Sequence, residues 1–337
     1  MSVQLKPLAE QTIVITGATS GHGLATAKKA AAAGAKVMLA ARDERALIDA
    51  CADIRASGGV AEYVVTDVSV EADVDHLATE TLARLGGFDT WVNNAGSGTY
   101  APLDQLPIRD HRQVFETNYW GVVHGSLAAL RHLKAAGGAL INVGSINGDM
   151  ASPILGAYNA SKHAVKGFTD SLRLDLMAEK APVSVTLIKP AAIGTPFPRH
   201  GRNLTGYEAR LPRPMYAPDL VADAILDAAQ HPRRDITVGG LGKLQVLSAT
   251  LMPSFFDLLA SKMDPALIDK TKPVGKVEGN LYAPQHDDGD VEGEQHGRTF
   301  STFTAARTHP LTAFGMVAAT IAGLALAARR PSSIVRP

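Results

Sequence analysis

The feature of this sequence that most constrains its fold is a regular alternation of short apolar runs with longer, alanine-rich stretches. The apolar runs contain many β-branched residues and are bounded by Gly, Asn or Asp, which is typical of buried strands. The stretches between them have helical periodicity and are long enough to connect parallel strands as crossovers. Strands are predicted at 12–17, 35–42, 61–68, 88–96, 138–146 and 183–191. The alternation therefore predicts an α/β protein whose parallel sheet carries helices on both faces.

The length of the chain, 337 residues, fits one large domain with an additional segment, because single hydrophobic cores stop growing near ~250–300 residues. A doubly wound domain, the Rossmann fold, is predicted over residues 1–245, with a C-terminal helical extension. Lys and Arg total 33, as do Asp and Glu, so no charge excess points to a nucleic acid. The single cysteine, Cys51, can form no internal disulfide and is expected to pack in a helix. No signal-peptide run precedes the first strand, so a cytoplasmic catalytic domain is expected.

A glycine-rich turn follows the first predicted strand, and its residues Gly17, Gly21 and Gly23 lead into a helix. At these positions the first glycine permits the turn, the second lets the backbone approach a pyrophosphate, and the third allows close helix–strand packing. A purely structural turn is the alternative. The place of this turn in the first strand–helix unit favours a bound dinucleotide.

The end of the second predicted strand distinguishes NADP from NAD. A carboxylate there would accept hydrogen bonds from the ribose 2′-hydroxyl of NAD and repel a 2′-phosphate. This chain has Ala41 followed by Arg42, and a guanidinium can bind a phosphate through two hydrogen bonds. An ordinary surface arginine is the alternative. We expect NADP, with NAD as the less favoured cofactor.

Polar residues also end the third and fourth predicted strands. Asp67 is expected to accept a hydrogen bond from the adenine amino group, with Val68 packed on the ring. Asn93 and Asn94 are expected to project into the crevice at the carboxyl ends of the strands, where doubly wound sheets bind ligands. These motifs share one edge of the sheet, and together they are stronger evidence for a nucleotide site than any one of them alone.

The chemistry is predicted from Ser145, Tyr158 and Lys162. Ser145 ends the fifth strand, and Tyr158 and Lys162 lie four residues apart on one face of the next helix. The connection allows the serine hydroxyl and the phenol to face one bound carbonyl. A tyrosine of ordinary pKa near ~10 is a poor base, and a neighbouring ammonium and a positive nicotinamide are expected to lower that pKa. Lys162 would also hold the nicotinamide ribose, and Asn118 would bind a water linking Lys162 to solvent.

These residues make the chain resemble the short-chain dehydrogenase/reductase family over about residues 10–240. The matching motifs are TGATSGHG (16–23), NNAG (93–96), TNYWG (117–121), Ser145 and YNASK (158–162). The resemblance implies a catalytic tetrad of Asn118, Ser145, Tyr158 and Lys162, with Tyr158 as acid/base and Ser145 polarising the substrate oxygen. It also implies nicotinamide contacts from 193–195 and hydride transfer between a carbonyl and an alcohol.

The complete set of predicted cofactor-binding residues comes from these motifs. They are Gly17, Thr19, Ser20, Gly21, Gly23, Arg42, Asp67, Val68, Asn94, Tyr158, Lys162, Ile193 and Thr195. Two residues depart from the family pattern without touching the tetrad. His22 stands where a branched apolar residue is usual, and Ala191 where a glycine usually follows the proline.

Residues 196–216 occupy the position of the family's substrate lid. This predicted lid contains four arginines: Arg199, Arg202, Arg210 and Arg213. They would either bind an anionic substrate tail or be exposed to solvent. The sequence does not identify the substrate, and no metal site is predicted. A homo-oligomer is expected.

Beyond residue 245 the strand–helix alternation ends. Residues 246–272 are predicted to form appended helices, 273–310 a polar linker, and 311–330 a candidate membrane helix. No charged residue occurs in 311–328, a length that meets the lower bound for a membrane span. A helix packed on the domain or across a dimer is the alternative. A C-terminal anchor would point to an apolar, lipid-like substrate.

Two other functions compete with an NADP-dependent oxidoreductase. A Rossmann-type regulatory protein that senses NADP(H) without turnover would have no need of Tyr158 and Lys162 at this spacing. A sugar-nucleotide epimerase uses a similar pair, but its longer glycine turn and nucleotide-sugar domain are not found here. Consumption of NADPH with ketones and aldehydes would distinguish the oxidoreductase from the NADP(H) sensor.

Overall fold

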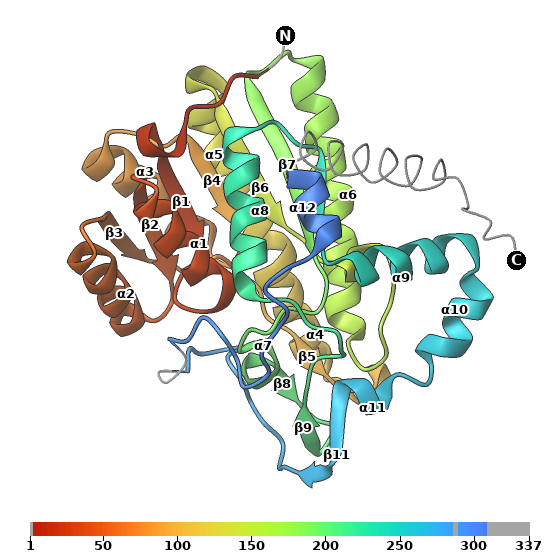
Figure 1. Cartoon of the computed structure of the whole chain (residues 1–337). Coiled ribbons are helices and arrows are strands. Elements are labelled where there is room, and N and C mark those ends of the chain that lie inside the picture. Colours follow the sequence, from red (N-terminus) through yellow and green to blue (C-terminus); the bar gives the residue numbers. More distant parts are fainter. Residues whose placement is uncertain (1–2, 286–288, 309–337) are drawn as a thin grey trace, which may run out of the picture.

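The computed structural model describes residues 3–285 and 289–308 and contains a seven-stranded parallel sheet at its centre (Figure 1). This confirms the predicted doubly wound α/β fold. In spatial order the strands are β10 (Asp235–Val238), β7 (Val183–Pro190), β6 (Gly138–Val143), β4 (Thr90–Asn93), β1 (Thr12–Thr16), β2 (Lys36–Ala41) and β3 (Val60–Val65). The chain runs outward from β1 to β2 and β3, then returns to β4 on the other side. A crevice therefore opens at the carboxyl ends of β1 and β4.

Two layers of helices cover the sheet, because successive side chains of a strand point to opposite faces. Ile13 and Ile15 of β1 are fully buried in one core and Val14 in the other. The first core is covered by α1 (Gly21–Ala32), α2 (Glu44–Ala56) and α8 (Pro218–Gln230). The second is covered by α3 (Glu71–Leu85), α5 (Gly121–Ala136) and α6 (Gly156–Ala178). Both faces are thus buried, as the near-continuous apolar strands require.

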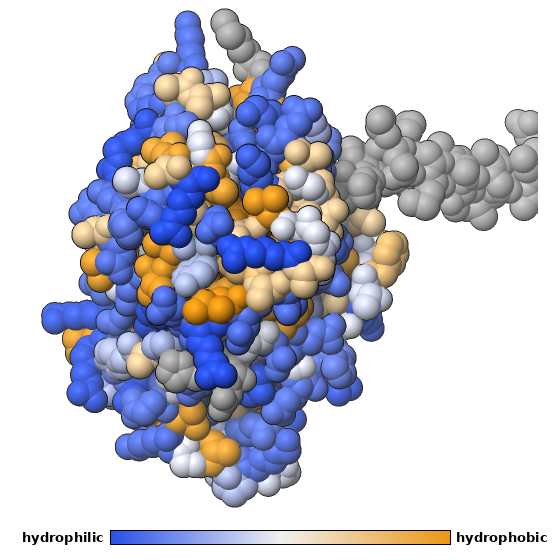
Figure 2. Space-filling view, turned by 90° about the vertical axis from the view of Figure 1, so that its left-hand side faces the viewer, coloured by the Kyte–Doolittle hydropathy of each residue, from blue (hydrophilic) through white to orange (hydrophobic). Residues whose placement is uncertain are grey.

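The six predicted strands are present, and the structure adds β10 at the edge of the sheet. β10 is not among the predicted strands, although Ile236 and Val238 are both buried in the first core. Cys51 is also buried there, as expected. The α2 and β3 side of the molecule, seen in Figure 2, is mostly hydrophilic with scattered hydrophobic residues.

Short elements complete the carboxyl edge of the sheet. They are β5 (Thr99–Tyr100), α4 (Ile108–Phe115), a π-helical turn (Glu116–Trp120), a 3-10 turn (Ile146–Gly148), α7 (Phe197–His200), β8 (Arg202–Asn203) and β9 (Tyr207–Ala209). After β10 come α9 (Gly240–Leu251), α10 (Pro253–Ala260), α11 (Asp264–Leu267), β11 (Ile268–Pro273) and α12 (Thr302–Thr308). β11 pairs antiparallel with β9, so the chain returns to the lid region after the appended helices.

The segment predicted as a polar linker, 273–310, is not a free linker over its described residues. Leu281 is fully buried, and Ser301 and Thr304 are also buried. Its backbone makes hydrogen bonds to the Rossmann domain, because its many glycines allow close approach. The polar side chains of this segment predict an exposed linker, whereas its main chain is hydrogen-bonded to the Rossmann domain.

The candidate membrane helix at 311–330 lies outside the described residues. Within 3–285 and 289–308, no helix is long and apolar enough to cross a bilayer.

Candidate active site

Two adjoining pockets occupy the carboxyl edge of the sheet. One is lined by the glycine-rich turn and by the ends of β2, β3 and β4, and we call it the nucleotide pocket. The other is lined by Ser145, Tyr158 and Lys162, and we call it the substrate pocket. They share His22, Asn94, Gly96, Thr195 and Phe197. Every predicted cofactor-binding residue lines one or both of the two pockets.

The glycine-rich turn connects β1 to α1 through close backbone contacts. Gly17 has a φ of +64°, a region that favours glycine, and an added Cβ would lie 2.8 Å from the Cα of Ala95. At Gly23 an added Cβ would lie 2.2 Å from the carbonyl oxygen of Gly17. These contacts hold the first turn of α1 against β1, so its N-terminal amides face the nucleotide pocket.

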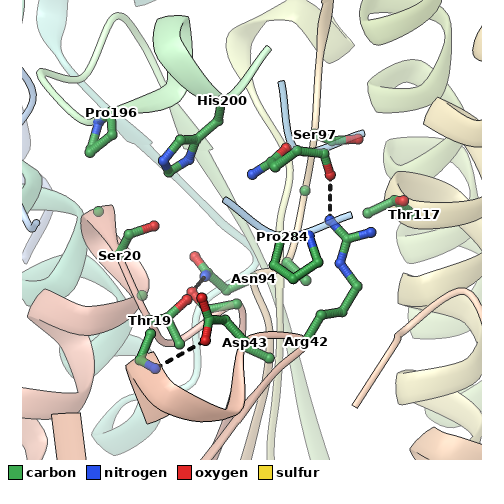
Figure 3. A pocket seen from close by; sticks show the side chains of 18 of the residues that line it. Thr19, Ser20, Arg42, Asp43, Asn94, Ser97, Thr117, Pro196, His200 and Pro284 are labelled. Atoms are coloured by element: carbon green, nitrogen blue, oxygen red, sulfur yellow. Dashed lines mark hydrogen bonds between the residues drawn. The ribbon is translucent and has the colours of Figure 1, made fainter. Parts of the chain in front are cut away.

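Arg42 and Asp43 follow β2 at the side of this pocket (Figure 3). Asp43 caps α2 by accepting a 3.1 Å hydrogen bond from the amide of Ala46. The guanidinium of Arg42 donates to the main-chain oxygen of Asn280. An arginine therefore stands at the second strand end with its position fixed by the C-terminal segment, and the carboxylate beside it is used in a helix cap.

The asparagines at the end of β4 have different roles. Asn94 lines both pockets, and its amide nitrogen donates to the main-chain oxygens of Thr16 at 2.9 Å and Gly17 at 3.1 Å. Asn93 points instead into the core, where its amide donates to Ser126 and Asn142. The expectation that Asn93 enters the crevice is wrong, because consecutive strand residues face opposite sides.

Asp67 and Val68 line the nucleotide pocket at the end of β3. Asp67 accepts hydrogen bonds from the amide of Ser69 at 2.9 Å and from its hydroxyl at 2.7 Å. These bonds fix the direction of the carboxylate after the strand.

The donor and acceptor atoms of the nucleotide pocket fit a polar ligand. Among the described residues, buried polar atoms of its lining without a hydrogen-bond partner include His22 Nδ1, Asn94 Oδ1, Ser97 Oγ and Asn280 Oδ1. Buried polar atoms are normally paired, so a set of them in one pocket indicates groups that a ligand satisfies. A dinucleotide supplies donors for the amide oxygens through its ribose hydroxyls, its adenine amino group and its carboxamide.

Ser145, Tyr158 and Lys162 lie together in the substrate pocket. The Lys162 ammonium lies 5.7 Å from the centre of the Tyr158 ring and donates to the main-chain oxygen of Val143 at 2.9 Å. Ser145 Oγ accepts a 3.1 Å hydrogen bond from the amide of Asn147, which orients the hydroxyl at the end of β6. The side chains thus come from a strand end and from one face of α6, the arrangement that their spacing predicts.

The pKa of Tyr158 is shifted opposite to the expected direction. Burial raises the pKa of its phenol, and a hydrogen bond with Ser145 acts the other way. Burial also lowers the pKa of Lys162 to about 8. Without the nicotinamide charge, the phenol pKa is therefore raised, because the loss of hydration outweighs the hydrogen bond with Ser145. The lowering expected from a bound positive nicotinamide stays a prediction.

Asn118 lies behind the two pockets, in the π-helical turn that joins α4 to α5. Its amide nitrogen donates to Ser97 O at 2.9 Å and to Ser161 Oγ at 3.0 Å, and its Oδ1 accepts from Ser97 N at 2.8 Å. The side chain is fully buried and lines neither pocket. It ties the loop after β4 to α6, so the structure gives it a positioning role; its predicted water contact stays a prediction.

His22 occupies the junction of the two pockets. Burial, together with the charge of Lys162, lowers the pKa of His22 to about 4. The imidazole is therefore neutral near pH 7. A neutral ring is compatible with the buried position where the family usually has a branched apolar residue.

The wall of the substrate pocket includes residues that the sequence analysis did not single out. They are mostly apolar and come from the turn after β6, from α9 and from the residues around α11: Ile146, Met150, Leu155, Leu241, Gly242, Met263 and Leu267. Of the lid arginines, Arg210 and Arg213 also line the pocket. Arg202 is buried in an ion pair with Asp110, 2.5 Å from its carboxylate, so it holds the lid rather than a substrate.

The comparisons with known proteins identify a relationship over most of the chain. A family model described as short chain dehydrogenase matches residues 11–203. The uncharacterized oxidoreductase YxnA of Bacillus subtilis is 39% identical over 95% of this chain and 91% of its own length. The 1-deoxy-11-beta-hydroxypentalenate dehydrogenase of Streptomyces avermitilis is 33% identical over 67% of this chain and 83% of its own.

Solved structures agree with these sequence similarities. A short chain dehydrogenase/reductase from Burkholderia phymatum in complex with NAD has a TM-score of 0.67 and 30% identity, covering 74% of this chain and 96% of its own. An alcohol dehydrogenase from Thermococcus sibiricus complexed with 5-hydroxy-NADP has a TM-score of 0.60 and 26% identity, covering 68% and 95%.

Proposed function

Because this chain belongs to the short-chain dehydrogenase family and is an oxidoreductase with a nicotinamide-cofactor fold, we propose that it is an NADP-dependent enzyme. Its reaction interconverts a carbonyl and a secondary alcohol. The observation that carries this proposal is the meeting of Ser145, Tyr158 and Lys162 in a pocket that adjoins the nucleotide pocket. The relatives named above are an oxidoreductase and a dehydrogenase, which favours this reaction over that of a sugar-nucleotide epimerase.

The proposed mechanism uses this chain's own groups to handle the proton. A bound nicotinamide supplies or accepts a hydride at its C4 position. In reduction, the Tyr158 hydroxyl donates its proton to the substrate oxygen, while Ser145 donates a hydrogen bond to the same oxygen. In oxidation the phenolate accepts the proton. The Lys162 ammonium favours the phenolate electrostatically, and its lowered pKa makes this support decline above about pH 8.

The preference for NADP is supported by Arg42 and by the surroundings of Asp43. Arg42 lines the nucleotide pocket, and no carboxylate occupies the preceding position, which is Ala41. Asp43 is directed to the amide of Ala46 in the helix cap. A guanidinium without a competing carboxylate favours a 2′-phosphate over a ribose hydroxyl. The related structures include one with NAD and one with an NADP analogue, so the distinction depends on these residues.

The proposed substrate is apolar and lipid-like. The substrate pocket has an apolar lining, and its wall contains parts of α9 and the residues around α11. The outer faces of α9 and α10 carry apolar residues that each expose about half or more of their surface: Leu244, Leu247, Leu251, Met252, Phe255, Leu258 and Leu259. These helices stand at the right of the molecule in Figure 1. This exposed apolar surface beside the substrate pocket supports attachment of the protein to the cytoplasmic face of a membrane.

A nucleotide-consumption assay tests the proposal. Full-length protein with NADPH, and separately with NADH, is given ketones and aldehydes ranging from small molecules to long acyl chains, and absorbance at the reduced nicotinamide band is followed. We expect NADPH consumption with bulky apolar carbonyls. Ser145→Ala is the control: it should bind NADPH but consume it far more slowly. Binding without consumption across the panel would favour the regulatory NADP(H) sensor instead.

A further inference from the structure

Part of the C-terminal segment crosses the nucleotide pocket. We call residues 277–285 and 289–298 the strap. In Figure 1 it belongs to the blue chain that leaves β11 and passes α7 before it reaches α12. The strap lies beyond residues 11–203, where the family model matches.

The strap is joined to the Rossmann domain by main-chain hydrogen bonds along its length. Asn280 N donates to His200 O at 2.8 Å, and Gly293 N donates to Gly194 O at 2.9 Å. At its end, Arg298 N donates to Met215 O at 2.8 Å. A side-chain bond adds to these, since the Tyr282 hydroxyl donates to Asp110 at 2.6 Å. The strap is therefore a packed part of the fold.

The glycines of the strap permit an unusually close approach. A Cβ added at Gly293 would lie 2.5 Å from the carbonyl oxygen of Thr195, and one added at Gly297 would lie 2.2 Å from the carbonyl carbon of Tyr216. At Gly275, before the strap, an added Cβ by contrast meets nothing within 4 Å among the described residues. The strap thus contacts the backbone of the nicotinamide-side loop at 193–195 with no space for a methyl group.

The strap also reaches the groups that would bind the dinucleotide. The main-chain oxygen of Asp290 accepts a 2.9 Å hydrogen bond from Gly21 N in the glycine-rich turn, and that of Asn280 accepts from Arg42. Asn280, Pro284 and Gln285 line the nucleotide pocket, and Figure 3 shows Pro284 beside Arg42. Asn280 Oδ1 is one of the buried acceptors without a partner among the described residues.

From these contacts we propose that the strap forms the outer wall of the dinucleotide site and must loosen for the cofactor to enter or leave. Asn280 is assigned as a cofactor-binding residue whose main chain also positions Arg42. The strap is hydrogen-bonded to the glycine-rich turn through Asp290 and to the 193–195 loop through Gly293. It would therefore cover a dinucleotide that extends from that turn to that loop. The proposal rests on the dinucleotide binding of the proposed function. Cofactor exchange would then be slow, because its rate would be limited by loosening of the strap.

Exchange kinetics test this. In full-length protein, NADPH association and dissociation are followed by stopped-flow fluorescence, with displacement by excess NADP. Gly293→Ala and Gly297→Ala should raise both rate constants about tenfold or more, because the added methyl groups push the strap from the domain. The matched control Gly275→Ala, outside the strap, should leave both rate constants unchanged. A purely structural role would reduce the fraction of protein that binds but would not accelerate association.

Milder variants cover the case in which the glycine variants do not fold. Tyr282→Phe removes the bond to Asp110 from a half-exposed side chain and should accelerate exchange a few fold. Asn280→Ala should weaken NADPH binding about fivefold or more. Wild-type exchange rates in all folded variants, with NADPH still bound, would overturn the strap proposal alone. Lack of nucleotide binding by the unmodified protein would overturn the proposed function with it.

Discussion

The nucleotide pocket and the substrate pocket adjoin each other, yet they are built differently. The nucleotide pocket uses strand ends and main-chain groups, held by glycines at which a Cβ would collide with backbone. The substrate pocket uses apolar side chains from the 3-10 turn after β6, the lid and the appended helices. A site made from backbone requires particular glycines at particular spacings. A site made from apolar side chains can be built from many sequences, so the first identifies a family and the second separates its members.

The largest effect should come from the phenol of Tyr158 in the substrate pocket. Tyr158→Phe keeps the ring, which packs 5.3 Å from the centre of the Phe197 ring, but removes the transferable proton. Turnover should fall by a factor of ~10² or more while NADPH still binds. Steady-state kinetics and equilibrium binding measure the two effects.

Tyr100→Phe is the matched control for this prediction. Tyr100 is a second buried phenol in the lining of the substrate pocket. It should retain most of the turnover. Equal losses for the two variants would contradict the acid/base role of Tyr158 and place the effect in the shape of the pocket.

The nucleotide pocket is tested next through Arg42. Arg42→Ala should weaken NADPH by a factor of ~10 to 100 and NADH much less, since a hydrogen bond to a charged group contributes ~1.5–3 kcal/mol. Titrations with both nucleotides give the ratio. Arg45→Ala, an exposed arginine one turn away, serves as the control. An equal loss of both nucleotides would contradict the NADP preference.

The apolar surface beside the substrate pocket should produce a smaller effect. A combined Leu251→Ser, Phe255→Ser and Leu258→Ser variant should reduce co-sedimentation with phospholipid vesicles severalfold, because it removes the apolar side chains that would enter the lipid. Ile48→Ser, an exposed apolar residue on α2, should leave sedimentation unchanged. If the unmodified protein stays in the supernatant, membrane attachment through this surface is wrong.

The smallest effect should be a pH dependence of stability through His22. Its pKa is about 4 in the folded protein and about 6.5 when unfolded, so between these values the unfolded chain binds more protons. Stability therefore falls as pH decreases from about 6.5 to about 4. His22→Ile lacks this titration. The melting temperature of the unmodified protein should drop by a few degrees more than that of the variant over this interval, and parallel profiles would contradict the shift.

The sequence predicted those parts of the molecule in which local pattern and tertiary role agree. Ile13 and Ile15 alternate with Val14 in a β-branched run, and both sets are buried in the sheet. Ser145, Tyr158 and Lys162 were predicted to meet because a strand end and one helix face have fixed geometries. The predicted direction of Asn93 is wrong because Asn93 is still part of β4, where successive side chains point to opposite faces of the sheet.

Other parts could not be predicted because their signal is not local. Leu281 is fully buried within a polar segment, because it belongs to a hydrophobic cluster with residues far away in the chain, among them Ala101 and Val114. Gly293 and Gly297 appear in the sequence as signals of a loop, whereas in the structure they are points of close approach. The pKa of Tyr158 depends on burial by Phe197 and the lid, which a four-residue spacing does not describe.

The antiparallel pairing of β11 with β9 has a kinetic consequence. β9 belongs to the lid at 196–216, and β11 continues almost directly into the strap. A substrate bound under the lid would therefore also stabilise the start of the strap and would slow the dissociation of the nucleotide. If the strap proposal holds, the nucleotide would bind before the substrate and leave after the product. In product-inhibition experiments the oxidised and reduced nucleotides would then compete with each other for the free enzyme, while the alcohol would not compete with the nucleotide.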